Sequence, residues 1–129
     1  MNPFKNNNEI QPKASINSVY VDNLLASDLF RPSILIEEIK KSAEILEIKP
    51  SLNDDEILLE FNQRLHSENV LIYKAANSIA VSFGDKLASV ILTLIKPSEL
   101  SVKLRKDWES IHWDFWKTIE KVIFVGGLT

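Results

Sequence analysis

Apolar side chains recur at helical spacing along most of the chain and predict four helices. The first should begin at residues 31–33, because proline is tolerated in the first turn of a helix. It should end before Pro50, since the residue preceding a proline disfavours helical geometry. Glu37 and Lys41 are expected to form an i,i+4 ion pair on its outer face. The apolar face should contain Leu35, Ile39, Ala43 and Leu46.

The second predicted helix has a clear N-terminal signal. Asn53, with Glu56 three residues later, approximates a capping box. Asp54 and Asp55 stand where the helix dipole favours negative charge. The buried face should consist of Ile57, Leu58, Phe61 and Leu65.

The third and longest helix is predicted from Ser67 to about Ile95. Its apolar residues spread nearly all round, which is typical of a central helix that several neighbours cover. Gly84 lies in its interior at a cost of about 1 kcal/mol relative to alanine, and suggests close packing of a neighbour. The most continuous ladder is Ala76, Ala80, Phe83, Leu87, Val90 and Leu94.

A fourth helix should be capped by Asp107, and all three tryptophans of the chain lie within nine residues there. Trp113 and Trp116 fall outside its main apolar face, so they are expected to need a second surface, either a partner subunit or a missing domain. Tryptophans at helical spacing are more often residues of a core or an interface than residues that bind a ligand. The main apolar face should contain Trp108, Ile111, His112, Phe115 and Ile119.

The chain ends in Lys121-Val-Ile-Phe-Val-Gly-Gly-Leu-Thr129, in which residues 122–125 read as a strand. A strand needs backbone partners, and a lone hairpin is marginal in water. We therefore expect Val122 and Phe124 to lie at an interface. The chain is then either a fragment of a larger α/β protein or one that borrows strands from a partner. Residues 18–21 slightly favour a second strand over a helical turn.

Composition narrows the function classes. The 129 residues carry a net charge of −3 without a basic stripe, which argues against nucleic acid as a partner. The chain lacks cysteine, which excludes disulfides and thiolate metal sites and fits a cytoplasmic location. Residues 1–17 read as a disordered tail without a signal peptide, followed by one domain over 18–129. No uncharged apolar run reaches about 18 residues, so we expect no membrane span.

Candidate chemistry is sparse. Asp54, Asp55 and Glu56 are consecutive, so on a helix they cannot easily converge on a metal. His66 and His112 belong to no metal-binding pattern, and His112 is most simply a packed core residue. We expect no catalytic residues and no metal site, with an enzyme built on His112 and Asp114 left as an open alternative.

Three features in order carry a family resemblance: the alanine-rich stretch 76–94, the connection that begins at Lys96-Pro97, and the glycine pair after the final strand. Residues 53–129 resemble the C-terminal half of an actin-like ATPase superfamily domain, most closely that of ROK-type sugar kinases. The resemblance implies a partial ribonuclease H-like subdomain, an α/β fold that is predominantly helical, with a long central helix packed against three others and one or two strands. It also implies that Gly126 and Gly127, with Leu128 and Thr129 beside them, border the adenosine of ATP.

The family's phosphate-binding hairpins, its catalytic loop with a general-base aspartate and its zinc loop have no counterpart in this sequence. Half a cleft cannot bring a phosphate donor and an acceptor together. The resemblance therefore implies a non-catalytic, partial sugar-kinase-like domain with at most a residual contact to ATP or adenosine. The alternative is a small helical interaction protein that oligomerises through its C-terminal strand and tryptophan-rich helix. Either reading expects a homodimer or a missing partner domain, without nucleic acid or membrane.

Overall fold

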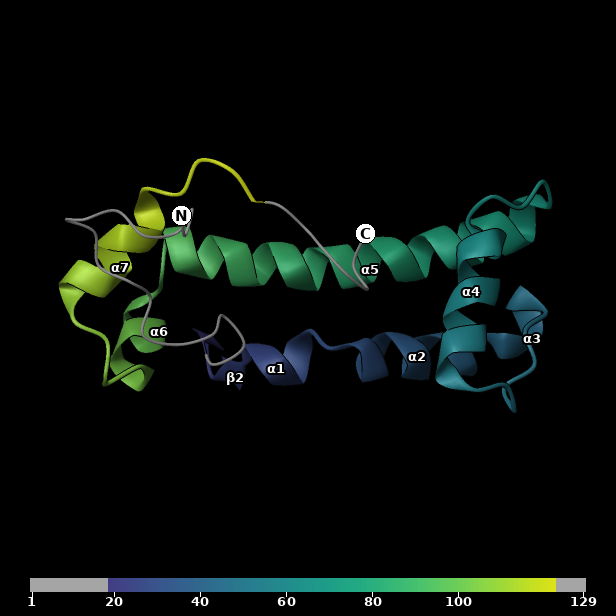
Figure 1. The fold of residues 1–129 in the computed structure, drawn as a ribbon, viewed down its shortest axis with the longest axis horizontal. Helices are drawn as coiled ribbons and strands as arrows, with labels where there is room; N and C mark the ends of the chain where they lie inside the picture. The colour runs from purple at the N-terminus through teal and green to yellow at the C-terminus, as the bar shows by residue number, and fades with distance from the viewer. Residues whose placement is uncertain (1–18, 123–129) are drawn as a thin grey trace, which may run out of the picture. The chain divides into compact units, whose positions relative to one another are not determined.

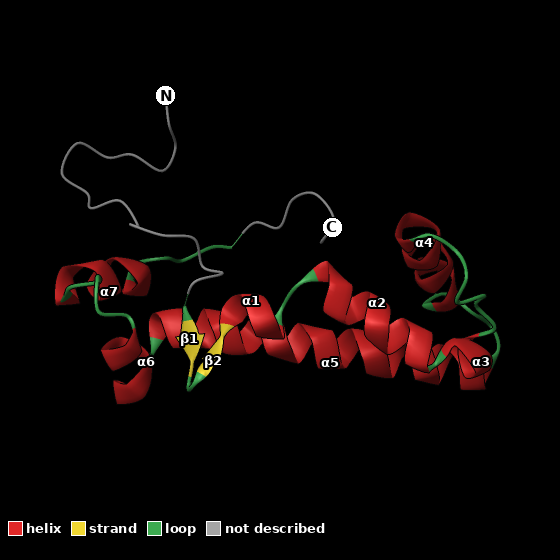
Figure 2. Cartoon of the chain, turned by 90° about the horizontal axis from the view of Figure 1, so that it is seen from below, coloured by secondary structure: helices red, strands yellow, loops and turns green. Residues whose placement is uncertain are grey.

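The structure is a computed structural model that describes residues 19–122. Its contacts group the described residues into two compact units. The terminal unit contains residues 19–26 and 90–122, and the central unit contains residues 27–89. Both are predominantly helical, as expected, and a two-stranded sheet accompanies the helices (Figure 1 and Figure 2). Whether residues 18–129 form one folding domain stays a prediction.

The terminal unit begins with a short antiparallel hairpin, drawn in yellow in Figure 2. Strand β1 (Tyr20–Val21) pairs with β2 (Leu24–Leu25), and α1 (Ala26–Leu29) follows directly. Asp22 adopts a left-handed conformation with φ 55° in the turn, which aspartate tolerates better than most residues. The preference for a strand at the start of this segment is thus confirmed. Its continuation as a second strand was not predicted.

The rest of the terminal unit is helical. It contains the last turns of α5 (Val70–Ile95), then α6 (Glu99–Leu104) and α7 (Ser110–Lys117). The Ser98 hydroxyl accepts the Ser101 N–H at 3.1 Å and caps α6. The buried core of this unit consists of Val19, Leu94, Trp108 and Trp113.

The predicted start of α7 was wrong, and its predicted face is confirmed only in part: Trp108 and His112 are buried, whereas Ile111 and Ile119 are exposed. The helix is preceded by Glu109 as its N-cap rather than Asp107, so Trp108 lies in the loop before it. The Trp108 ring packs edge-on against Trp113 at 4.8 Å between centroids, which turns the Trp113 side of the helix inward. Ile111, predicted to be buried, is 48% exposed. Tertiary packing of a loop residue, invisible to helical periodicity, selected this face.

The central unit contains residues 27–29 of α1, then α2 (Pro32–Lys41), α3 (Ala43–Leu46), α4 (Asp54–Arg64) and residues 70–89 of α5 (Figure 1). Pro32 occupies the first turn of α2, as predicted. The helix is interrupted at Ser42, and α3 ends at Leu46, followed by Glu47 as its C-cap with a left-handed φ of 54°. The core of the unit comprises Ile36, Ile39, Leu46, Ile48, Ile57, Phe61 and Ala76.

Of two local polar contacts predicted for the central unit, one is present and one is replaced. The Asn53 Oδ1 accepts the Glu56 N–H at 2.9 Å, and Glu56 Oε2 accepts the Asn53 N–H at 3.1 Å, which confirms the capping box. Lys41, however, pairs with Glu38 at 3.0 Å rather than with Glu37. Positions i and i+3 are also neighbours on a helix, and the hydrogen bond from Lys41 to Glu38 raises the pKa of Lys41.

Helix α5 begins three residues later than predicted. The Asn69 Oδ1 accepts the N–H groups of Leu71 and Ile72 at 3.0 and 3.2 Å, so Asn69 caps the helix. The predicted apolar ladder is confirmed at its ends, where Ala76, Val90 and Leu94 are buried.

Coverage of α5 on several sides is not found among the described residues. Val81 is 54% exposed and Leu71 is 69% exposed. No described atom outside the helix's own backbone lies within 4 Å of where a side chain at Gly84 would begin, so this glycine does not admit a close neighbour. Periodicity reports which residues are apolar, but whether other elements reach them depends on the tertiary arrangement.

Candidate interaction surfaces

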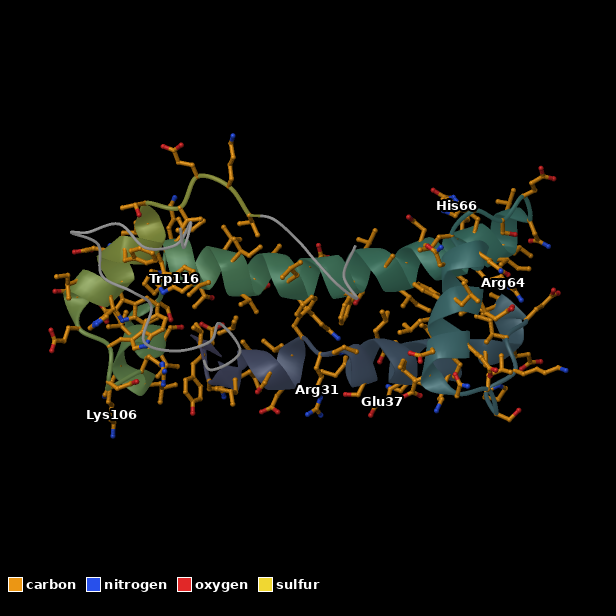
Figure 3. The ribbon with its side chains drawn as sticks, viewed as in Figure 1. Arg31, Glu37, Arg64, His66, Lys106 and Trp116 are labelled. Carbon is orange, nitrogen blue, oxygen red and sulfur yellow. The ribbon has the colours of Figure 1, made fainter. Side chains whose placement is uncertain are left out.

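Three tryptophan rings form a mutually packed cluster in the terminal unit. Trp108 lies edge-on to Trp113 at 4.8 Å and nearly parallel to Trp116 at 6.2 Å. Trp108 and Trp113 are 5% and 3% exposed, whereas Trp116 is only partly covered. Trp116, labelled in Figure 3, therefore offers the indole surface that another molecule can reach.

Arg105 covers one side of the cluster. Its guanidinium carbon lies 5.2 Å from the centre of the Trp108 ring, in the range of a cation–π contact. The same guanidinium pairs with Asp107 at 3.0 Å. Arg105 thus holds the loop before α7 against the tryptophans.

The cluster contains several buried hydrogen-bond donors. The indole N–H groups of Trp108, Trp113 and Trp116, and Nε of Arg105, have no acceptor among the described residues. An unpaired buried donor costs about 1–3 kcal/mol. The packing of the rings against one another must offset this cost within the cluster.

An apolar hollow of about 210 Å³ lies beside Trp116. Val122, which is 52% exposed, borders it. A second hollow of about 430 Å³ lies on the Trp113 side and has more polar walls, including Lys96, Asp114 and Lys117. The first hollow is lined by Ile91, Leu94, Ile95, Trp116, Ile119, Glu120 and Val122.

The predicted interface residues fall into three groups. Trp116 and Val122 meet at the apolar hollow. Trp113 is covered within its own unit. It therefore does not need the second surface that its position outside the main apolar face of the fourth helix suggested. Phe124, and the nucleotide candidates Gly126 and Gly127, lie outside the described residues, as does most of the predicted C-terminal strand. Their roles stay predictions.

The candidate catalytic residues have local contacts. His112 is buried, and its Nδ1 accepts the Glu109 N–H at 3.0 Å at the start of α7. Asp114 pairs with Lys117 at 3.3 Å on the surface. Within residues 19–122, no group of three histidine, aspartate or glutamate side chains could hold a metal ion. His66 lies beyond the end of α4 and is exposed (Figure 3).

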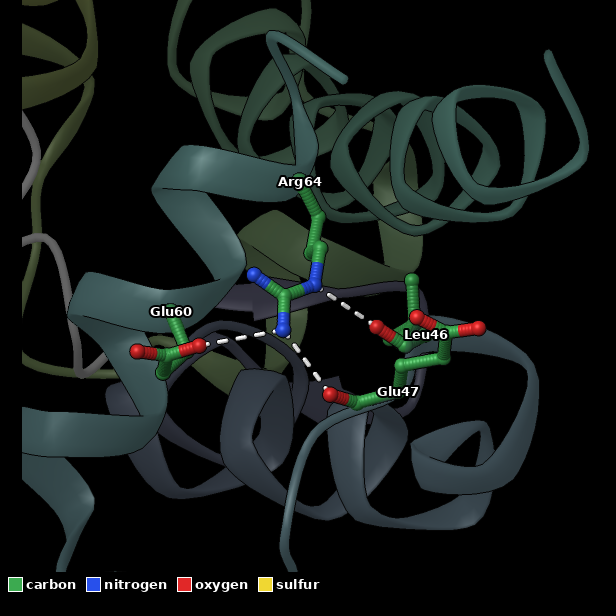
Figure 4. Close-up of polar contacts among 4 residues, drawn as sticks. All are labelled: Leu46, Glu47, Glu60 and Arg64. Atoms are coloured by element: carbon green, nitrogen blue, oxygen red, sulfur yellow. Dashed lines mark hydrogen bonds and ion pairs between the residues drawn. The ribbon is translucent and has the colours of Figure 1, made fainter. Parts of the chain in front are cut away.

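Arg64 makes the principal polar contacts of the central unit (Figure 4). Its Nε donates to the Leu46 carbonyl at 2.7 Å, and its Nη2 donates to the Glu47 carbonyl at 2.8 Å. Glu60, one turn earlier on α4, pairs with the same Nη2 at 3.0 Å. These bonds satisfy carbonyls at the end of α3 and attach α4 to it. Sequence reasoning missed this role, because the partners lie 17 and 18 residues away.

A second surface lies on α5 within the central unit. We call it the outer stripe: exposed residues at alternating spacings of three and four, which place them on one side of the helix. Leu71 and Val81 supply its larger apolar side chains, and Lys74 and Asp85 its charges. The outer stripe consists of Leu71, Lys74, Ser78, Val81, Asp85 and Ala88.

Because much of α5 is exposed, the question arises whether this helix could span a membrane. By length and composition alone, this 26-residue helix could cross a bilayer, with a mean hydropathy of 1.6 over its most apolar window. One such helix is weak support for a span, because core helices of soluble proteins have similar composition, although only 11% of this window is buried. The expectation that the chain has no membrane span stays a prediction.

We compared the chain with protein-family models, curated proteins and solved structures. No family model, curated protein or solved structure matches this chain.

Proposed function

We propose that the protein is a helical interaction protein that self-associates in the cytoplasm through the apolar hollow of its terminal unit, and that it is not an enzyme by itself. The observation that carries this proposal is the meeting of Trp116, Ile119 and Val122 around one apolar hollow at the surface. Exposed apolar patches on soluble proteins commonly mark interaction sites.

The chemistry of the hollow suits a polypeptide partner. Tryptophan is enriched among residues that dominate binding energy, because its large ring can be desolvated in one well-packed contact. The Trp116 ring is only partly covered, so its exposed part can be desolvated by a partner at the hollow. The predicted C-terminal strand, which begins at Val122, would bring additional backbone groups to the same interface.

Aspartate substitution at the rim tests this proposal. Ile119→Asp and Val122→Asp place a charge in the apolar hollow, and burying an unpaired charge is costly. Both residues are exposed, so the fold should persist. We expect each variant to self-associate at least tenfold more weakly than the wild type in sedimentation velocity across a concentration series.

Leu59→Asp is the matched control. Leu59 is 60% exposed on α4 of the central unit, so the substitution has the same chemistry away from the hollow. It should leave self-association unchanged. Wild-type behaviour of both rim variants, or equal weakening by the control, would contradict the assignment of this surface.

A second candidate follows from the resemblance: a partial actin-like ATPase domain that contacts adenosine through Gly126 and Gly127. What supports it is the long α5 that ends directly before Lys96-Pro97, the order on which the resemblance rests. Calorimetric titration with ATP–Mg and with adenosine tests it. Binding should be lost in Gly126→Val and Gly127→Val, since a side chain there would block close approach of the ligand. Undiminished binding in both variants would exclude this site.

A further inference from the structure

The outer stripe of α5 carries two opposite charges at a spacing that suits a symmetric pair. Lys74 and Asp85 are 11 residues apart, which is close to three helical turns, so both point to the same side. Both are exposed, and neither forms an ion pair among the described residues. Between them on the same stripe lie Ser78 and Val81.

We propose that two copies of the chain pair along this stripe with their α5 helices antiparallel, so that Lys74 of each copy faces Asp85 of the other. This inference rests on the proposed self-association and adds a second contact surface, in the central unit. The two-fold axis passes between Ile79 and Ala80, midway between the two charges. A two-fold interface is self-complementary, so the single Lys74–Asp85 arrangement forms twice.

The other stripe positions fit the same register. The axis that brings Lys74 opposite Asp85 also brings Leu71 opposite Ala88 and Ser78 opposite Val81. Each of these pairs sets a larger side chain against a smaller one, which lets two helices approach closely and interdigitate. Parallel pairing in register would instead set Lys74 against Lys74 and Asp85 against Asp85, and like charges in apposition are costly.

The same charges disfavour a bilayer as the surface that covers this stripe. Lys74, Asp85 and the adjacent Lys86 all lie within α5. A charged residue at the centre of a membrane-spanning helix costs about 2.5–3.5 kcal/mol on insertion scales. In the antiparallel pair, two of these three charges are matched at a surface that water still reaches.

Charge reversal tests the register. Lys74→Glu sets Glu against Asp85 twice in each pair, and Asp85→Lys sets Lys against Lys74 twice. We expect each single variant to self-associate at least tenfold more weakly than the wild type in sedimentation velocity at low salt. An equimolar mixture of the two variants should recover wild-type association, because every facing pair is then of opposite sign. The double variant should recover it as well.

Lys49→Glu is the control, since it makes the same charge change at an exposed position off the stripe. Two results would overturn the register: reversed variants that associate like the wild type, or a mixture that recovers no association. If Ile119→Asp and Val122→Asp still weaken association in that case, the antiparallel α5 register is overturned and self-association through the apolar hollow stands. If only charge reversal weakens association, self-association through the apolar hollow is overturned and the antiparallel α5 register stands. Wild-type protein that stays monomeric but binds phosphatidylcholine vesicles would replace the pair with a membrane surface.

Discussion

At the scale of single residues, Gly84 is the clearest case in which the structure changes what a substitution should do. The sequence suggested that this glycine admits a closely packed neighbour, but the space around it is open among the described residues. Gly84→Ala should therefore raise the free energy of unfolding by about 0.5–1 kcal/mol, because alanine restricts the unfolded chain and favours helix. Urea unfolding at low protein concentration measures this. A loss of stability would reveal a neighbour that the described residues do not include.

At the scale of elements, Arg64 connects α4 to the end of α3. Arg64→Met keeps much of the side-chain volume but leaves the Leu46 carbonyl, in a part-buried bond, and the Glu47 carbonyl without their donor. We expect a loss of about 1–3 kcal/mol in the free energy of unfolding. Arg31→Met is the control: Arg31 pairs with Asp28 only at 4.0 Å and both side chains are mostly exposed, so the change should stay within about 0.5 kcal/mol. Equal losses in both variants would show that the carbonyl contacts carry no special stability.

Element boundaries were predictable where the signal is local and uncertain where it is not. Pro32 and the Asn53–Glu56 capping box marked two helix starts correctly, since each acts within its own turn. The start of α7 was misplaced by the choice of Asp107 over Glu109, and its buried face followed a contact between Trp108 and Trp113. Residue type was enough to predict Trp116 and Val122 as interface residues. That both line the same apolar hollow could not be predicted from the sequence.

At the scale of the whole molecule, the prediction is self-association. Assembly of folded copies is linked to folding by mass action, so the midpoint of thermal unfolding should rise with protein concentration. Differential scanning calorimetry over a hundredfold range of concentration measures this. The dependence should weaken in Lys74→Glu and return in the mixture with Asp85→Lys. A midpoint independent of concentration in the wild type would contradict assembly through either surface.

Residue order alone determined the helical character of the chain, the helix starts at Pro32 and Asn53 and the apolar ladder of α5, because proline geometry, capping hydrogen bonds and helical periodicity act over a few residues. Tertiary structure decided the rest: which tryptophan is covered, what Arg64 binds, and which side of α5 stays open to water. These depend on contacts between residues distant in the chain, whose geometry is set only when the elements pack.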